Sequence, residues 1–268
     1  MIEIGWDPNI HIGPITLAWH GIFTAVGIFF GVWLPVRLLR GRVPEDQAYS
    51  IATWGVAGGI IGARLFAVVD RWDFYSAHLE QISQIWTGGI AVWGAAFGGV
   101  LVGFIVAVRR RFPIGAGADA AAAGIALGFA IGRIGDIING EHHAIACGGL
   151  PWCVGYSFPA ELGGLGQPGP VHPAVAYDLL VNLAIVGVTL LLRSALVGRP
   201  PEGRIFWIWA ILYGANRFVE GFLRIDDPTP ILGLRQDQLI GFAVVSAGAV
   251  MLTYLAVIAR RRRELVPA

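Results

Sequence analysis

The sequence contains no lysine, and charged residues make up only 14% of its 268 residues. A soluble domain of this size usually has about a quarter charged residues. Hydrophobic residues make up 56% of the chain, and the mean hydropathy is +0.66. The shortage of charge therefore indicates that lipid surrounds most of the chain. The net charge of +1 gives no reason to expect a nucleic-acid partner.

Cysteine is also scarce, with Cys147 and Cys153 as the only two. They lack the paired spacing of a zinc site, and the adjacent His142 and His143 should point apart, so we expect no metal and no cofactor. Whether the two cysteines form a disulfide depends on the side of the membrane on which they lie. An oxidising exterior favours a disulfide, and the alternative is two free thiols.

Long apolar stretches make up most of the sequence. A helix needs roughly 20 mostly apolar residues to cross a bilayer. The first stretch has no basic segment before it and is longer than the ~7–15 residues of a signal-peptide core, so we expect a true span. We predict an all-α polytopic membrane protein with about seven spans in a single domain, residues 1–268. The expected spans lie near 15–38, 48–69, 88–108, 114–135, 173–193, 204–223 and 238–259.

Arginine is enriched in the loops that follow the odd-numbered spans. These are the segments 37–42, 109–111, 193–204 and 260–263. Because basic short loops stay in the cytoplasm, this asymmetry predicts an N-terminus outside and a C-terminus inside. The loop 136–172 would then form a small extracytoplasmic head.

Small residues recur at four-residue spacing within the expected spans. Residues spaced in this way share one helix face and let two backbones approach closely, so tight helix packing explains them. The pairs are Gly55 with Gly59, Gly58 with Gly62 and Gly94 with Gly98, and a longer ridge contains Ala120, Gly124, Gly128 and Gly132.

Four arginines fall within or at the outer ends of spans: Arg64, Arg133, Arg217 and Arg224. Charge in a membrane helix is costly and usually faces an interior cavity with a partner. Arg217, Glu220 and Arg224 share one helical face, so Glu220 should pair with both arginines. The group is either an ion-pair cluster that joins helices or an anion site, because guanidinium matches phosphate geometry. A phospholipid head group is the commonest anion at this depth.

The run from Gly132 to Glu141, GRIGDIINGE, leaves the fourth span on its outer side. A glycine-flanked arginine followed by a polar turn lets a guanidinium approach a ligand. The run resembles the signature of the prolipoprotein diacylglyceryl transferase family, Gly-Arg-x-Gly-Asn-Phe-x-Asn-x-Glu. Other segments resemble the family in order and spacing over nearly the whole chain. They are Trp19-His20-Gly21, Gly62-Ala63-Arg64, Gly88-Gly89-Ile90, His172-Pro173-Ala174 with Tyr177 and Asp178, and Tyr213-Gly214 with Arg217 and Leu223-Arg224.

The resemblance implies a seven-helix enzyme of the bacterial cytoplasmic membrane. Such an enzyme takes the diacylglyceryl group from phosphatidylglycerol, transfers it to the lipobox cysteine thiol of a prolipoprotein signal peptide, and releases glycerol phosphate. Displacing a phosphate ester requires stabilisation of its developing charge, for which we expect Arg133 and Arg217. The expected catalytic residues are Arg133, Arg217, Glu141, Glu220 and His20, and the expected substrate-binding residues are Arg133, Asn139, Arg64, Arg224 and Asp136.

The sequence departs from the family where the thiol must lose its proton to become the nucleophilic thiolate. Many members have a histidine where this chain has Trp93, and tryptophan cannot act as a base. The chain also has His20 and Asp136 where the family has tyrosine and asparagine. The base stays open among His20, His142, His143 and Glu141.

These departures leave other interpretations open. One is a non-catalytic relative that binds phospholipid or lipoprotein precursors. Another is an anion transporter, because intramembrane arginines can line an anion pathway, although the sequence has no evident inverted repeat. An intramembrane protease has least support, since neither a Gly-x-Ser-x-Gly motif nor paired intramembrane aspartates stand out.

Overall fold

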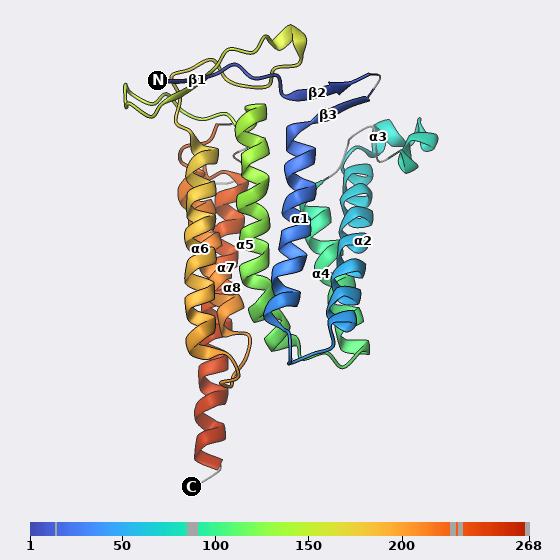
Figure 1. Cartoon of the computed structure of the whole chain (residues 1–268), viewed down its shortest axis with the longest axis vertical. Helices are drawn as coiled ribbons and strands as arrows, with labels where there is room; N and C mark the ends of the chain where they lie inside the picture. Colours follow the sequence, from blue (N-terminus) through green and yellow to red (C-terminus); the bar gives the residue numbers. More distant parts are fainter. Residues whose placement is uncertain (14, 85–90, 226–228, 230–232, 266–268) are drawn as a thin grey trace. The chain divides into compact units, whose positions relative to one another are not determined.

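The computed structural model describes residues 1–13, 15–84, 91–225, 229 and 233–265. Nearly all of its regular structure is helical (Figure 1), which confirms the predicted all-α class. The long helices are α1 (Trp19–Leu38), α2 (Glu45–Asp70), α4 (Val92–Arg109), α5 (Ile114–Asn139), α6 (Ala174–Leu196), α7 (Arg204–Glu220) and α8 (Gln236–Leu265). The short ones are α3 (Trp72–Tyr75), η1 (Leu79–Ser83) and η3 (Ala160–Leu162).

Five helices in the described part of the chain are long and apolar enough to cross a membrane: α1, α2, α5, α6 and α8. Helix α4 contributes a shorter apolar segment, and α7 is 17 residues long. Large apolar side chains, such as those of Phe29, Leu191 and Val250, lie exposed along these helices. Exposed apolar surface on this scale suits lipid, so the chain is a multi-pass membrane protein.

The ends of two spans differ from expectation. Residues 15–18 form strand β3 (Ile15–Ala18), which pairs antiparallel with β2 (Asn9–Ile12), and α1 begins only at Trp19. A short apolar run with β-branched residues is compatible with either structure, which explains the difference. The polar turn expected after Arg133 is wrong, because α5 continues to Asn139 and the chain turns at Gly140, where φ is 74°. The expected start of the third span, 88–90, lies outside the described residues.

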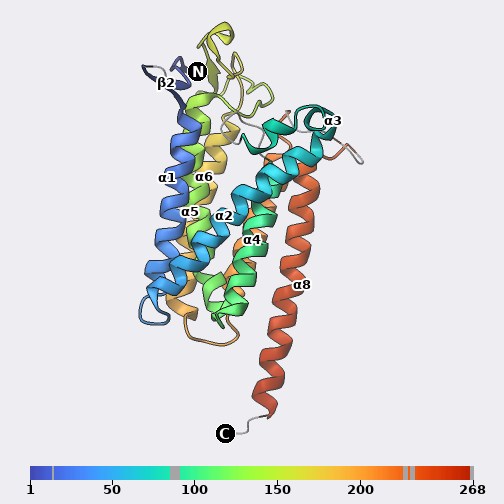
Figure 2. The ribbon, with the colours of Figure 1, turned by 90° about the vertical axis from the view of Figure 1, so that its right-hand side faces the viewer.

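The chain forms two compact units, residues 1–35 with 118–268, and residues 36–117. In the second unit α2 and α4 lie side by side (Figure 2). A methyl group added to Gly62 or to Gly98 would lie 3.0 Å from the Cα of the other. These small residues therefore set how closely the helices approach. The single domain predicted for residues 1–268 stays a prediction.

In the first unit, glycines also bring helices together. Gly27 and Gly31 of α1 face Gly124 and Gly128 of α5, with hardly any room for a side chain between them. The packing role predicted from the small-residue spacing is thus confirmed for these positions, whereas Gly132 has open space beside it. Of the five candidate spans, α5 is the most buried, with 39% of its apolar window inside the protein. Asp136 and Asn139 near its C-terminal end are buried as well.

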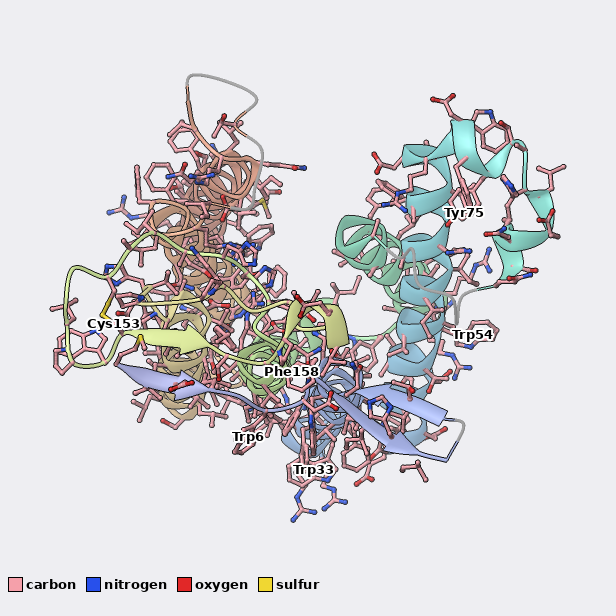
Figure 3. All side chains as sticks on the ribbon, turned by 90° about the horizontal axis from the view of Figure 1, so that it is seen from above. Trp6, Trp33, Trp54, Tyr75, Cys153 and Phe158 are labelled. Carbon is pink, nitrogen blue, oxygen red and sulfur yellow. A yellow bond between two sulfur atoms is a disulfide. The ribbon has the colours of Figure 1, made fainter. Side chains whose placement is uncertain are left out.

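A cap covers the helix ends of the first unit and consists of strand β1 (Ile2–Ile4) and the chain from 140 to 173 (Figure 1). Strand β1 pairs in parallel with β4 (Val154–Tyr156). Cys147 and Cys153 are disulfide-bonded next to β4 (Figure 3), so the disulfide that the sequence left open is formed.

Candidate active site

Arg133 lies near the C-terminal end of α5, bound to carboxylates of two helices. Its Nε donates to Asp178 Oδ2 of α6 at 2.5 Å, and its Nη1 donates to Asp136 Oδ2 at 2.6 Å. The two acidic side chains are buried, with 1% and 5% of their surface exposed. Because buried charges are stable only when paired and hydrogen-bonded, these contacts fix the plane of the guanidinium group.

Asp178 connects three helices. Its Oδ1 accepts hydrogen bonds from Asn182 Nδ2 of α6 at 3.0 Å and from Asn216 Nδ2 of α7 at 2.5 Å, while Oδ2 binds Arg133 of α5. Asp178, Asn182 and Asn216 were not among the site residues expected from the sequence. The position of Asp178 inside an expected span was the available signal for it, because intramembrane acids usually have a partner.

A second cluster lies where α7 ends. Glu220 Oε2 accepts a hydrogen bond from Arg217 Nη1 at 2.6 Å, and Glu220 Oε1 lies 3.8 Å from Arg224 Nη1. Arg217 Nη2 also lies 3.5 Å from Asp237 Oδ2 of α8. The predicted pairing of Glu220 with both arginines is therefore confirmed. The single helical face expected for the three residues is wrong for Arg224, because α7 ends at Glu220 and Arg224 lies beyond it, in a bridge with Ala144 of the cap.

His142 of the cap links the two clusters. Its Nδ1 lies 2.8 Å from Arg224 Nη2, and its Nε2 lies 3.3 Å from Arg133 Nη1. Arginine only donates and a neutral imidazole has one acceptor nitrogen, so we assign the shorter contact, from Arg224 Nη2 to Nδ1, as the hydrogen bond. The ring proton then lies on Nε2, 4.0 Å from Asp136 Oδ2, and the approach of Nε2 to Arg133 Nη1 is a contact without a hydrogen bond. The φ of His142 is 70°, a conformation that is uncommon without glycine and is often found at functional sites. Contacts thus run continuously from Arg133 through His142, Arg224 and Glu220 to Arg217.

His20, on the first turn of α1, joins the same network. Its Nδ1 lies 2.5 Å from Asp136 Oδ1 and 3.6 Å from Glu141 Oε2. The ligand atoms of these three residues lie within 4.8 Å of one another, as a metal site requires. Two ligands of one zinc-like ion are usually at least roughly 3 Å apart, however, and Arg133 already occupies the other Asp136 oxygen. We therefore interpret the contact between His20 and Asp136 as a hydrogen bond.

Asn139 and Glu141 lie where α5 turns into the cap. Asn139 Nδ2 lies 3.4 Å from Glu141 Oε1, and Asn139 Oδ1 is buried without a hydrogen-bond partner in the part of the chain described. A pocket of about 40 Å³ lies next to Glu141 and is also lined by Tyr156 and His172. Burial raises the pKa of Tyr156 to about 12, so the phenol stays protonated and donates to a backbone carbonyl of α5. The pocket has room for water or a small polar group.

Arg64 belongs to the second unit and makes different contacts. Its Nε donates to the carbonyl of Ile82 at 2.9 Å, and its Nη2 donates to that of Gln81 at 2.5 Å. The guanidinium carbon lies 5.1 Å from the centre of the Tyr75 ring. These contacts tie the η1 segment to α2, and the substrate-binding role of Arg64 stays a prediction.

Two further residues that the sequence analysis discussed are His143 and Trp93. His143 Nε2 lies 2.9 Å from the carbonyl of Leu165, so the side chains of His142 and His143 diverge as predicted. Trp93 begins α4 with Val92, but its side chain lies outside the described part of the structure.

The fold and the site define a multi-pass helical membrane protein with a buried network of arginines and carboxylates beneath a disulfide-bonded cap. The sequence model described as Prolipoprotein diacylglyceryl transferase matches residues 8–254, and the chain belongs to this family.

Similar proteins carry the corresponding name, phosphatidylglycerol–prolipoprotein diacylglyceryl transferase. The one from Thermosynechococcus vestitus is 37% identical over 248 residues, which cover 90% of this chain and 89% of that protein. The one from Nostoc sp. is 34% identical over 266 residues, which cover 97% and 92%. The one from Bacillus licheniformis is 34% identical over 256 residues, which cover 91% and 90%. The resemblance inferred from the motifs is therefore confirmed.

Proposed function

We propose that the protein transfers the diacylglyceryl group of phosphatidylglycerol to the lipobox cysteine thiol in a prolipoprotein signal peptide and releases glycerol phosphate. The names of its relatives give the lipid donor and the protein acceptor for those proteins. For this chain, the supporting observation is the contact path that links Arg133 of α5 to Arg217 of α7 through His142 of the cap.

The transfer forms a carbon–sulfur bond and breaks the carbon–oxygen bond between the glyceryl group and phosphate. Negative charge develops on the leaving phosphate, so donors fixed there in advance stabilise the transition state. Arg133 uses Nε and Nη1 for its carboxylate partners, and its Nη2 makes no hydrogen bond to any residue described. We assign Nη2 of Arg133 to the phosphate, with Arg217 as the second donor.

Among the described residues, four carboxylates contact three arginines in this network. Asp136 and Asp178 contact Arg133, Glu220 and Asp237 contact Arg217, and Glu220 also contacts Arg224, so a free anion would meet repulsion as well as attraction. The acids hold the guanidinium groups in orientation before the lipid arrives, and orientation is what transition-state stabilisation requires. An anion-conducting path would need a lining of net positive charge, so this arrangement favours transfer over transport.

We also propose that the network and the cap face outward from the bacterial cytoplasmic membrane, with the C-terminus inside. The disulfide supports this orientation, because disulfides persist in oxidising compartments. Single cysteines introduced at Leu162 in the cap and at Arg110 after α4 test it. A membrane-impermeant maleimide applied to intact cells should label Leu162→Cys and not Arg110→Cys. Equal labelling at both positions contradicts the proposed topology.

The activity test is transfer of a labelled diacylglyceryl group from phosphatidylglycerol to a lipobox peptide by the purified protein. Wild type should turn over. Arg217→Lys keeps the charge but loses the planar fork, and we expect turnover to fall on the order of 10²-fold. Arg40→Lys is the matched control, because Arg40 is exposed and pairs only with Glu45 among the contacts described. Full activity of Arg217→Lys contradicts the phosphate role, and an inactive but folded wild type supports the non-catalytic alternative.

A further inference from the structure

His20 and Asp136 form a histidine–carboxylate pair between the start of α1 and the end of α5. The Nδ1 to Oδ1 distance is 2.5 Å. An ionised carboxylate only accepts, so Nδ1 carries the ring proton and Nε2 presents its lone pair. We propose that Nε2 of His20 removes the proton from the acceptor thiol, an inference that rests on the proposed transfer.

The two members of this pair differ in exposure. A base must be accessible to the substrate, whereas the residue that positions it can be buried. The side chain of His20 is 44% exposed, whereas that of Asp136 is 5% exposed. Gly135 makes the contact possible, since a methyl group there would lie 2.8 Å from the Cα of His20. His20 can therefore meet a second substrate while Asp136 holds its ring from the protein side.

The other candidate bases are engaged differently. His142 Nδ1 accepts from Arg224, so its lone pair is already used. The His143 side chain hydrogen-bonds to the carbonyl of Leu165 and, among the described residues, to no arginine. Glu141 lies 3.6 Å from His20 Nδ1, where its negative charge stabilises the imidazolium that forms when His20 accepts a proton.

Asp136 also connects the base to the phosphate donor. Its Oδ1 contacts His20, and its Oδ2 accepts from Arg133 Nη1 at 2.6 Å. One carboxylate thus positions the group that removes the proton and the group that stabilises the leaving phosphate. The thiolate would then form beside the bond that it has to break.

The proton and electron pairs balance as follows. The thiol proton moves to His20 Nε2, and the sulfur electron pair forms the bond to the glyceryl carbon. The carbon–oxygen bond breaks, and its electron pair leaves on glycerol phosphate next to Arg133. The imidazolium, between Asp136 and Glu141, then gives its proton to that phosphate or to water. The arrangement resembles a Ser-His-Asp triad whose nucleophile belongs to the second substrate.

His20→Asn tests the base directly, because the asparagine Nδ2 can still donate to Asp136 Oδ1 but offers no basic nitrogen. We expect turnover at neutral pH to fall roughly 10²–10⁴-fold, with little change in the KM for phosphatidylglycerol. The deficit should shrink above pH ~8.5, where a peptide thiol ionises without help. His11→Asn is the matched control, since His11 is an exposed histidine on β2, and it should match wild type at every pH.

The pH profile separates the possible outcomes. A deficit of His20→Asn that stays constant with pH contradicts the role of base and leaves only a positioning role. Wild-type turnover by His20→Asn also overturns the inference. No turnover by folded wild type rejects the proposed transfer itself, which is a different result. Rates are taken on the monodisperse fraction, and His20→Gln, which also lacks a base, replaces a His20→Asn protein that does not fold.

Discussion

The protein buries arginine in two ways. Arg64 of α2 donates to backbone carbonyls of the η1 segment and lies over the Tyr75 ring. Arg133 of α5 donates to two buried carboxylates, Asp136 and Asp178. A carbonyl that loses its donor can turn to water, whereas a buried carboxylate that loses its arginine is left as an uncompensated charge. The first arrangement ties a segment to a helix, and the second makes several helices depend on one another.

The largest expected effect on stability comes from replacing a buried arginine while its hydrogen-bond partners stay in place. Arg133→Gln should lower the free energy of unfolding by about 3–5 kcal/mol, because Asp136 and Asp178 lose their countercharge. Arg64→Gln should lower it by about 1–3 kcal/mol. Thermal unfolding in one detergent measures both. Adding Asp178→Asn to Arg133→Gln should recover part of the stability but no transfer activity. Equal losses of unfolding free energy for Arg133→Gln and Arg64→Gln would contradict the difference between the two kinds of buried arginine.

Backbone contact in the α2–α4 pair gives the second prediction. A methyl group at Gly62 would lie 3.0 Å from the Cα of Gly98 and closer still to the carbonyl of Gly94. Gly62→Ala should therefore lower the unfolding free energy by about 3 kcal/mol, near the upper end of the usual cost of overpacking. Gly187→Ala in α6, where nothing lies within 4 Å, is the control and should be neutral or slightly stabilising. If both alanines behave alike, close helix approach does not hold this pair together.

The disulfide of the cap gives the smallest of the three effects. Closing the short loop between Cys147 and Cys153 should contribute about 2 kcal/mol by restricting the unfolded chain. Cys147→Ser with Cys153→Ser should lose this amount, and reductant should lower the stability of wild type equally while leaving the double variant unchanged. Mass spectrometry of the unreduced wild type should show the two peptides linked. Freely alkylated thiols in protein from its native membrane would contradict the bond.

Local patterns predicted those features that depend on local spacing. Five of the expected spans coincide with helices that are long and apolar enough to cross a membrane, and the count of seven stays a prediction. The pairing of Glu220 with Arg217 follows from their separation on one helix. Strand β3 was missed because a four-residue apolar run does not distinguish a strand from a helix. The contact of Asp178 with Arg133 depends on which helices are neighbours, and no local pattern specifies this.

The departures from the family pattern show the same limit. His20 and Asp136 looked like two separate substitutions in the sequence, since they lie in different helices. The structure brings them within hydrogen-bond distance, so the two changes form one feature. The role of His142 depended in turn on how the cap folds back over Arg133 and Arg224.

The parallel pairing of β1 with β4 sets the order of events during biosynthesis. Ile2 lies opposite Val154, so β1 is synthesised well before the strand with which it pairs. At a synthesis rate of ~5–20 residues per second, the delay is roughly 8–30 s. During that time α1, α2, α4 and α5 are made, and the N-terminal strand has an unpaired edge. The cap therefore closes late, and any tag fused to the N-terminus travels with the closing strand.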